Sequence, residues 1–230
     1  MDKHTSDNHR QPVTTARGNI IGADGVVRPP WATRSELERA YFDEEWGRPI
    51  ITESGLLERI CLEGFQSGLS WATILRKRRA FRDHFFLFDA TRITQMSAEQ
   101  REAALADPAL IRNPQKHSAI YRNAEAAVAL REDPELQELP EDHPAREFLG
   151  GAVRRLPAGL PVLIWSYAPA EHQPPAHIAE MPSESEESVA MAAELKRRGF
   201  TFVGPTTCYA LMQAIGMVDD RVPEPDAEQP

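Results

Sequence analysis

The sequence predicts an all-α protein. Helix-capping patterns recur along the chain, apolar residues repeat at helical spacing, and the one β-like run, Phe200 to Val203, is too short to found a sheet. The 230 residues suffice to bury a sizeable core in one domain or two closely packed lobes. We therefore expect one helical unit rather than a string of modules.

The start of each predicted helix is marked by a capping residue or a proline. Capping residues precede helices at Ser35, Thr52, Ser70, Ser97, Asn113 and Ser183, and Pro205 begins the last helix. Capping boxes are expected to pair Ser35 with Glu38, Ser97 with Gln100 and Ser183 with Glu186. Glycines then end several of these segments, at Gly47, Gly199 and Gly216.

Both ends of the chain are predicted to be disordered. Residues 1–30 mix polar residues, glycine and proline without an apolar period, and residues 221–230 are rich in proline and acids. We expect the helical domain over residues 31–220. Within it, an extended connection at about 131–161 carries an acidic stretch.

The net charge of −9 does not exclude a nucleic-acid partner, because two acidic stretches, 131–147 and 219–230, account for all of it. Against the neutral remainder stands one dense basic run: Arg76, Lys77, Arg78, Arg79 and Arg82. Taken alone, this run favours a solvated helix face over a binding surface.

The cysteines indicate a reducing compartment. Cys61 and Cys208 both lie in apolar sequence, and no secretory signal accompanies them. No apolar stretch approaches the length of a spanning helix, which is about 18 residues. We expect a soluble, cytoplasmic protein.

One acid is placed where apolar residues belong. The helix predicted over about Glu53 to Gln66 carries on one stripe Leu56, Ile60, Glu63 and Ser67. A carboxylate on this stripe must find donors or a cationic partner, because unpaired burial is costly. Two interpretations stay open for Glu63: a structural acceptor for a helix end near Gly68 to Trp71, or an acid that lines a pocket for a cationic ligand.

Aromatic residues gather in the same part of the chain, at Trp31, Tyr41, Trp46 and Trp71. Taken singly, each is an ordinary core residue. Stacking walls beside one acid, however, suit a flat, positively charged heterocycle.

These residues lie in motifs that resemble the 3-methyladenine DNA glycosylase I family, in particular Tyr41-Phe-Asp-Glu-Glu-Trp-Gly47 and Ile60-Cys-Leu-Glu-Gly-Phe-Gln-Ser-Gly-Leu-Ser-Trp71. Further ordered matches extend the resemblance from about Trp31 to Asp220. It implies a helix-hairpin-helix DNA glycosylase fold, with helical lobes around a base-binding pocket. It also implies a monofunctional enzyme of base-excision repair, which flips 3-methyladenine out of DNA and hydrolyses its N-glycosidic bond.

The resemblance assigns roles to individual residues. Tyr41 and Glu63 are expected to hydrogen-bond the flipped base while Trp71 stacks on it, and Trp31 and Trp46 are expected to frame the pocket. Glu63 is the one residue expected to assist the chemical step, through an electrostatic preference for a cationic base. Leu69 is expected to fill the gap that the flipped base leaves in the duplex.

The family's phosphate-binding hairpin corresponds to residues 107–113, between a helix over about Ala98 to Leu105 and one that starts at Pro114. Arg112 and Lys116 are expected to contact phosphate there, beside the amides of a helix N-terminus. The expected partner is double-stranded DNA containing alkylated bases, bound by a monomer that associates with the nucleoid through DNA.

No metal or other cofactor is expected. Members of the family carry a structural zinc, but its ligand positions correspond here to Pro29, Phe42, Arg221 and Pro225, which cannot bind zinc as Cys or His would. We expect the packing of Phe42 and the tail itself to replace it. Two alternatives stay open: a paralogue with altered lesion specificity, and a non-catalytic helix-hairpin-helix binder of distorted DNA.

Overall fold

The computed structural model describes residues 11–224, apart from the side chains of 153–155. It is mostly helical, which confirms the predicted fold class. The α-helices are α1 Glu36–Glu44, α2 Glu53–Gln66, α3 Trp71–His84, α4 Ala90–Thr94, α5 Ala98–Ala106, α6 Pro114–Leu130, α7 Ala145–Leu149, α8 Leu160–Trp165, α9 Glu186–Arg197 and α10 Pro205–Ala214. Short 3-10 turns are η1 Pro30–Thr33, η2 Phe86–Phe88, η3 Pro134–Leu136, η4 Gly150–Arg155 and η5 Ile178–Glu180.

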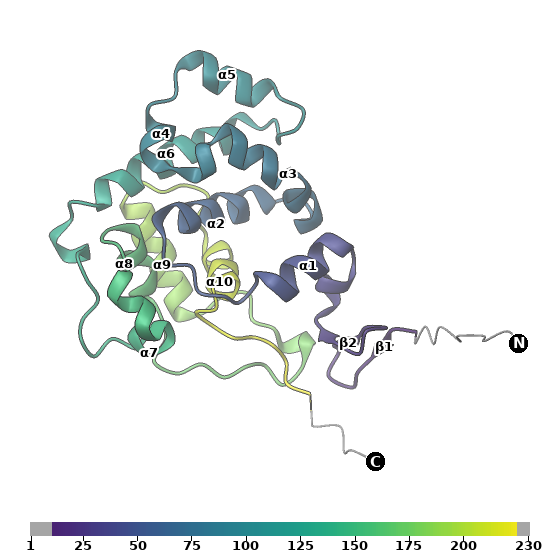
Figure 1. Ribbon diagram of the computed structural model, residues 1–230. Helices are drawn as coiled ribbons and strands as arrows, with labels where there is room; N and C mark the ends of the chain where they lie inside the picture. Colours follow the sequence, from purple (N-terminus) through teal and green to yellow (C-terminus); the bar gives the residue numbers. More distant parts are fainter. Residues whose placement is uncertain (1–10, 225–230) are drawn as a thin grey trace, which may run out of the picture.

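Helix α2 is the centre of the fold. It crosses the middle of the molecule, with α3 to α6 on one side and α7 to α10 on the other (Figure 1). It packs against α3, α6, α8 and α10, and its residues from Leu56 to Phe65 are all buried. Glu63 therefore lies in a buried stretch of the central helix.

Local capping patterns explain most helix starts. Ser70 accepts from Thr73 N, Asn113 accepts from Gln115 N and Lys116 N, and the predicted box of Ser97 with Gln100 is present. The predicted pair of Ser183 with Glu186 is wrong. Helix α9 instead begins after Ser185, whose box is completed by Ser188, because a serine at the third helical position also reaches back to the cap.

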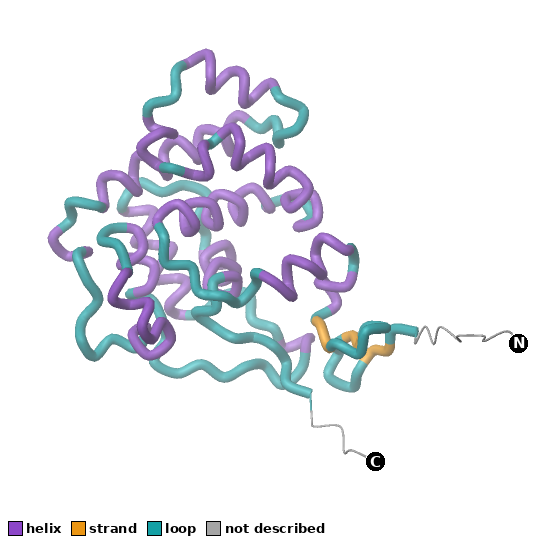
Figure 2. Tube along the Cα trace, viewed as in Figure 1, coloured by secondary structure: helices purple, strands orange, loops and turns teal. Residues whose placement is uncertain are grey.

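The chain before residue 30 is not a disordered tail throughout. Strands β1 Val13–Thr14, β2 Ile20–Ile21 and β3 Val27–Arg28 form an antiparallel sheet, in which Val13 pairs with Ile21 and Ile20 pairs with Arg28. Figure 2 shows this sheet beside the C-terminal segment. Residues 1–10 of the predicted tail lie outside the described residues.

Contacts with the other end of the chain order this segment. Asn19 Nδ2 donates to Val222 O at 3.0 Å and to Glu224 Oε1 at 2.8 Å, and Thr15 Oγ1 donates to the same carboxylate at 2.6 Å. The predicted disorder of residues 221–230 is therefore wrong for residues 221–224, while 225–230 lie outside the described residues. We call these contacts the terminal clasp.

The other expected irregular regions also acquire structure. Phe200 to Val203 forms no strand, because Asn123 Oδ1 accepts from Thr201 N at 2.8 Å and Phe202 adopts a φ of 57°. The acidic connection contains η3, α7 and η4, and it buries Leu136 and Leu149 in the core. In the part of the chain that the structure describes, no helix has the length and apolar character to cross a membrane.

Candidate functional site

A cleft of about 1020 Å³ opens between η1, α1, α2 and the start of α3 on one side, and β3, η5, α10 and residues 220–222 on the other. Six predicted site residues line it, namely Trp31, Tyr41, Trp46, Glu63, Leu69 and Trp71. The structure therefore brings together, from different helices and a turn, the residues that the sequence singled out for a base pocket. The predicted DNA-contact residues Arg112 and Lys116 lie outside this cleft.

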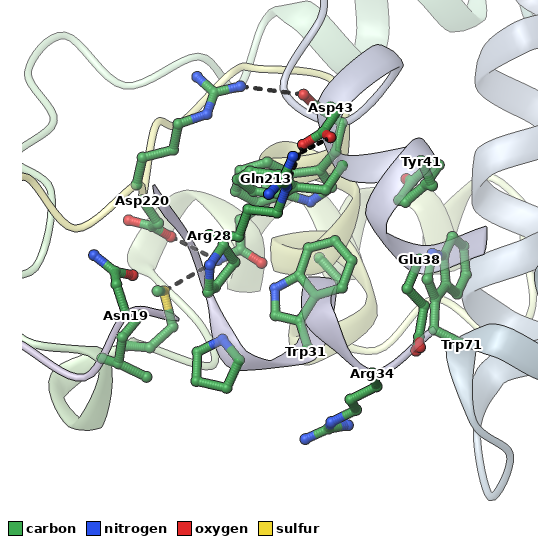
Figure 3. A pocket seen from close by; sticks show the side chains of 18 of the residues that line it. Asn19, Arg28, Trp31, Arg34, Glu38, Tyr41, Asp43, Trp71, Gln213 and Asp220 are labelled. Carbon is green, nitrogen blue, oxygen red and sulfur yellow. Dashed lines mark hydrogen bonds and ion pairs between the residues drawn. The ribbon is translucent and has the colours of Figure 1, made fainter. Parts of the chain in front are cut away.

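Tyr41 and Trp71 form one of the two closest aromatic pairs in the cleft. Their ring centroids are 5.3 Å apart at an interplanar angle of 56°, and Trp31 lies 6.3 Å from Tyr41 (Figure 3). Trp46 instead stacks on Phe42 at 5.3 Å. The indole Nε1 of Trp71 is buried and has no hydrogen-bond partner among the described residues, so this wall offers an unused donor.

An ion-pair network behind Tyr41 joins α1, α2 and α3, three of the helices that line the cleft. Arg59 Nη1 on α2 donates to the Tyr41 hydroxyl at 3.0 Å, and its Nη2 pairs with Glu45 at 2.8 Å. Arg78 on α3 pairs with Glu45 at 2.7 Å and with Glu58 at 2.5 Å. Burial raises the pKa of Tyr41, so its hydroxyl stays protonated, and while it accepts from Arg59 it can donate its own proton toward the cleft.

Glu63 has no such partner. Its side chain lines the cleft at 8% exposure, and no hydrogen bond or ion pair to it exists among residues 11–224. Burial raises the pKa of Glu63 from 4.5 to about 7, and the charge of Arg59 opposes this only in part. The turn at Gly68 to Trp71 is closed without Glu63, which favours the pocket acid over the structural acceptor.

Sequence reasoning missed other residues of the cleft. Glu38 and Gln66 both line it. Each lies three residues from a predicted site residue on the same helix, Glu38 from Tyr41 and Gln66 from Glu63, and therefore shares its face. Glu38 was hidden because its position also suits a capping role.

Leu69 stands at the edge of the cleft. It follows Gly68, whose φ of 78° lets the chain turn sharply between α2 and α3. Its side chain is 38% exposed although it is apolar. An exposed apolar side chain at this edge suits the predicted role of Leu69, which is to fill the gap in the duplex.

The hairpin lies where the resemblance predicts it, between α5 and α6. Lys77 on α3 holds it in place, since Lys77 Nζ donates to the carbonyls of Pro108, Ala109 and Leu110. Arg112 is exposed and forms no ion pair or hydrogen bond with the described residues. Its charge is therefore available to a partner.

The predicted phosphate contact of Lys116 is contradicted by the structure. Its Nζ donates to Phe65 O and Ser67 O at 2.7 Å each, and the side chain is 7% exposed. The ammonium group thus caps the C-terminal end of α2, where backbone carbonyls lack helical partners. A buried charge committed to these carbonyls does not reach DNA.

The basic run is neither a simple solvated face nor a continuous binding surface. Arg78 and Arg82 pair with Glu58, and Lys77 binds the hairpin carbonyls. Arg76 and Arg79 remain exposed. Most of the run therefore joins elements of the fold.

The residues at the family's zinc positions do not fit a metal. Phe42 stacks on Trp46, and the Arg221 guanidinium lies 5.9 Å and 5.5 Å from their ring centroids, so a cation already covers this aromatic pair. Pro225 lies outside the described residues. Elsewhere within the described part, no group of three or more His, Cys, Asp or Glu side chains is arranged to hold a metal ion.

Comparisons with known proteins identify the family of this chain. The chain matches the family model for methyladenine glycosylase over residues 31–141 and 145–226. It is 36% identical over 201 residues to the DNA-3-methyladenine glycosylase of Haemophilus influenzae, which covers 86% of this chain and 95% of that protein. The DNA-3-methyladenine glycosylase 1 of Escherichia coli K12 is also 36% identical, with coverage of 86% and 94%.

Solved structures of 3-methyladenine DNA glycosylase I superpose on this chain. A crystal structure of 3-methyladenine DNA glycosylase I superposes with a TM-score of 0.68 at 37% identity, covering 83% of this chain and 93% of that chain. The Staphylococcus aureus enzyme, solved to study 3-methyladenine recognition, superposes with a TM-score of 0.66 at 23% identity, covering 82% and 89%. The second likeness shows the shared fold.

Replacing Lys116 by methionine should destabilise the protein. The carbonyls of Phe65 and Ser67 would lose their buried donor, which costs about 1–3 kcal/mol of unfolding free energy. Denaturant unfolding measures the loss, with Arg112→Met as the control because Arg112 makes no contact of this kind. Equal stability of the two variants would contradict the capping role.

The purified protein should contain no stoichiometric zinc, because proline, phenylalanine and arginine occupy the ligand positions. Chelation should leave the melting temperature unchanged. Metal analysis that finds about one zinc per chain would mean that other residues have been recruited.

Proposed function

Because this chain belongs to the 3-methyladenine DNA glycosylase I family, we propose that it hydrolyses the N-glycosidic bond of 3-methyladenine in DNA. It is a DNA glycosylase of base-excision repair. The observation that carries the proposal is the buried, unpaired carboxylate of Glu63 beside the rings of Tyr41 and Trp71. A cleft with this charge and these walls suits a flat cation better than a neutral base.

The chemistry requires little acid catalysis. Alkylation at N3 makes the adenine cationic, so the bond from C1′ to N9 is already weakened. When this bond breaks, its electron pair goes to the base, which leaves neutral. A water oxygen bonds to C1′ and loses a proton, and the products are 3-methyladenine and an abasic site. We assign no side chain as the base that takes this proton.

The side chains of the cleft select the flipped base and favour its positive charge. Tyr41 and Glu63 read the edge of the flipped base, and Trp71 stacks on its face, while Trp31 and Trp46 frame the cleft. Arg59 acts as a positioning residue, because it holds the Tyr41 hydroxyl. Glu63 favours the cationic base electrostatically, and the low dielectric around it strengthens this effect.

The hairpin and the edge of the cleft bind the duplex. Arg112 neutralises phosphate beside the N-terminus of α6, and Leu69 enters the space left by the flipped base. The protein is proposed to act as a monomer on double-stranded DNA, in the cytoplasm and at the nucleoid. A non-catalytic binder of distorted DNA is disfavoured, because duplex binding requires no such cleft.

The direct test is release of the base. Full-length protein is incubated with DNA alkylated by dimethyl sulfate, and free bases are separated by chromatography. We expect 3-methyladenine to appear well above its spontaneous rate. A protein that binds this DNA but releases no base would favour the non-catalytic alternative, and release of other alkylated bases instead would favour the paralogue.

Glu63→Gln should separate recognition from stability. In the wild type the folded state holds the proton of Glu63 more tightly than the unfolded state, because the pKa of Glu63 is raised. The free energy of unfolding therefore falls as the pH rises from 4.5 to about 7. The amide removes this loss, so the variant should be more stable than the wild type at pH 8, by about 3 kcal/mol at most.

Base excision and cation binding by the same variant should fall, since one charged hydrogen bond of about 1.5–3 kcal/mol is lost. Thermal unfolding and affinity are measured on one preparation at pH 6 and pH 8. A destabilised protein with normal affinity would restore the structural interpretation of Glu63.

Arg112→Ala should weaken binding to abasic-site DNA. It should also reduce the slope of the logarithm of the binding constant against the logarithm of the salt concentration by about 1. The affinity for the free base should not change, because Arg112 lies outside the cleft. Lys116→Met is the matched control, and its salt slope should stay that of the wild type. An unchanged slope for Arg112→Ala would place the phosphate contacts elsewhere, with Arg76 and Arg79 as the next candidates.

A further inference from the structure

Two of the buried carboxylates among the described residues, those of Glu58 and Asp220, have several donors. Glu58 pairs with Arg78 at 2.5 Å and with Arg82 at 3.0 Å. Asp220, only 1% exposed, accepts from the Tyr209 hydroxyl at 2.7 Å and also from the side chains of His172 and Gln213. These two acids show how the fold compensates a charge that it buries for structural reasons.

Glu38 departs from this pattern. Its side chain is 3% exposed and lines the same cleft as Glu63. Within residues 11–224 its one hydrogen bond comes from Ser35 Oγ at 2.8 Å, and no ion pair reaches it. Arg34 also lines the cleft but extends away from Glu38 (Figure 3).

A capping role does not account for Glu38. In a capping box the third helical residue accepts from the backbone N–H of the cap, as Gln100 does for Ser97 at 2.9 Å. Glu38 makes no such bond to the backbone of Ser35, and only the serine side chain contacts it. Its carboxylate therefore has acceptor capacity left over inside the cleft.

The surroundings of Glu38 point to a ligand. It shares a face of α1 with Tyr41, and Figure 3 shows it on the same side of the cleft as Tyr41 and Trp71. Glu63 reaches the cleft from α2, also without a partner among the described residues, and the buried Trp71 Nε1 is unused. Two helices thus each present an uncompensated carboxylate to one aromatic wall.

We propose that Glu38 is a second specificity-determining residue of the base pocket, whose carboxylate accepts a hydrogen bond from the exocyclic amine of a positively charged purine. This inference rests on the proposed function. With Glu38 and Glu63 on different helices, the cleft discriminates by charge more strongly than with one acid. Glu38 tightens binding of cationic alkylated purines and contributes little to neutral ones.

The test compares two probes that differ in charge. 3,9-Dimethyladeninium carries a fixed positive charge, whereas 3-methyladenine is neutral at pH 8. Calorimetry at pH 8 measures the affinity of both for the full-length wild type, Glu38→Gln, Glu38→Asp and Glu36→Gln. Glu36 is the matched control, because it lies in the same first turn of α1 but is exposed and outside the cleft.

Glu38→Gln should weaken binding of the cation about tenfold and leave the neutral probe nearly unchanged. Glu38→Asp should lie between this variant and the wild type, and it carries the same comparison if the amide variant fails to fold. Glu36→Gln should match the wild type with both probes.

Two results would overturn the inference. One is a Glu38→Gln variant with the charge preference of Glu36→Gln, and the other is an equal loss for both probes together with a lower melting temperature. Excision from alkylated DNA by the wild type is measured on the same preparation. Wild-type excision with an unaltered preference in Glu38→Gln rejects this inference alone, whereas absent wild-type excision rejects the proposed function.

Discussion

The geometry of the cleft depends on the contacts of Arg59 with Tyr41 and Glu45. Its guanidinium bonds the Tyr41 hydroxyl at 3.0 Å and pairs with Glu45 at 2.8 Å, which ties α1 to α2. Arg78 extends the same network to α3 through Glu45. Because Arg59 is committed to these two partners, it holds the aromatic wall in place without neutralising Glu63. The contacts of Arg59 thus explain both the fixed position of Tyr41 and the unpaired carboxylate of Glu63.

An uncompensated carboxylate in a central helix costs stability, and function explains why it is retained. Burial raises the pKa of Glu63 to about 7, so near neutral pH the charge is held at an energetic disadvantage that a cationic base relieves. Such preorganised charge needs no rearrangement when the base arrives, and the surrounding low dielectric makes it count for more than in water. The central helix α2 is a suitable place for it, because neighbours on several sides fix its backbone.

Local patterns predicted the parts of the fold that local physics decides. The start of α6 at Asn113 and Pro114 depends on capping atoms within three residues, and the stripe of α2 that carries Glu63 depends on helical spacing alone. The N-terminal sheet escaped prediction, because Asn19 is ordered by Val222 at the other end of the chain. Lys116 was misplaced for the same reason: its partners are carbonyls at the end of a helix distant in sequence. The family resemblance supplied the roles of the cleft residues, which spacing alone left open.

Glu63 lies in the cleft as an unpaired acid that a cationic base can pair with. Carbon-detected NMR of the side-chain carboxyl groups gives the pKa of Glu63 directly, with Glu63→Gln used to assign its signal. We expect a pKa of about 7 in the free protein and a marked fall when 3,9-dimethyladeninium is bound. A pKa near 4.5 that the cation leaves unchanged would contradict this expectation, because Glu63 would then have a partner of its own within the protein.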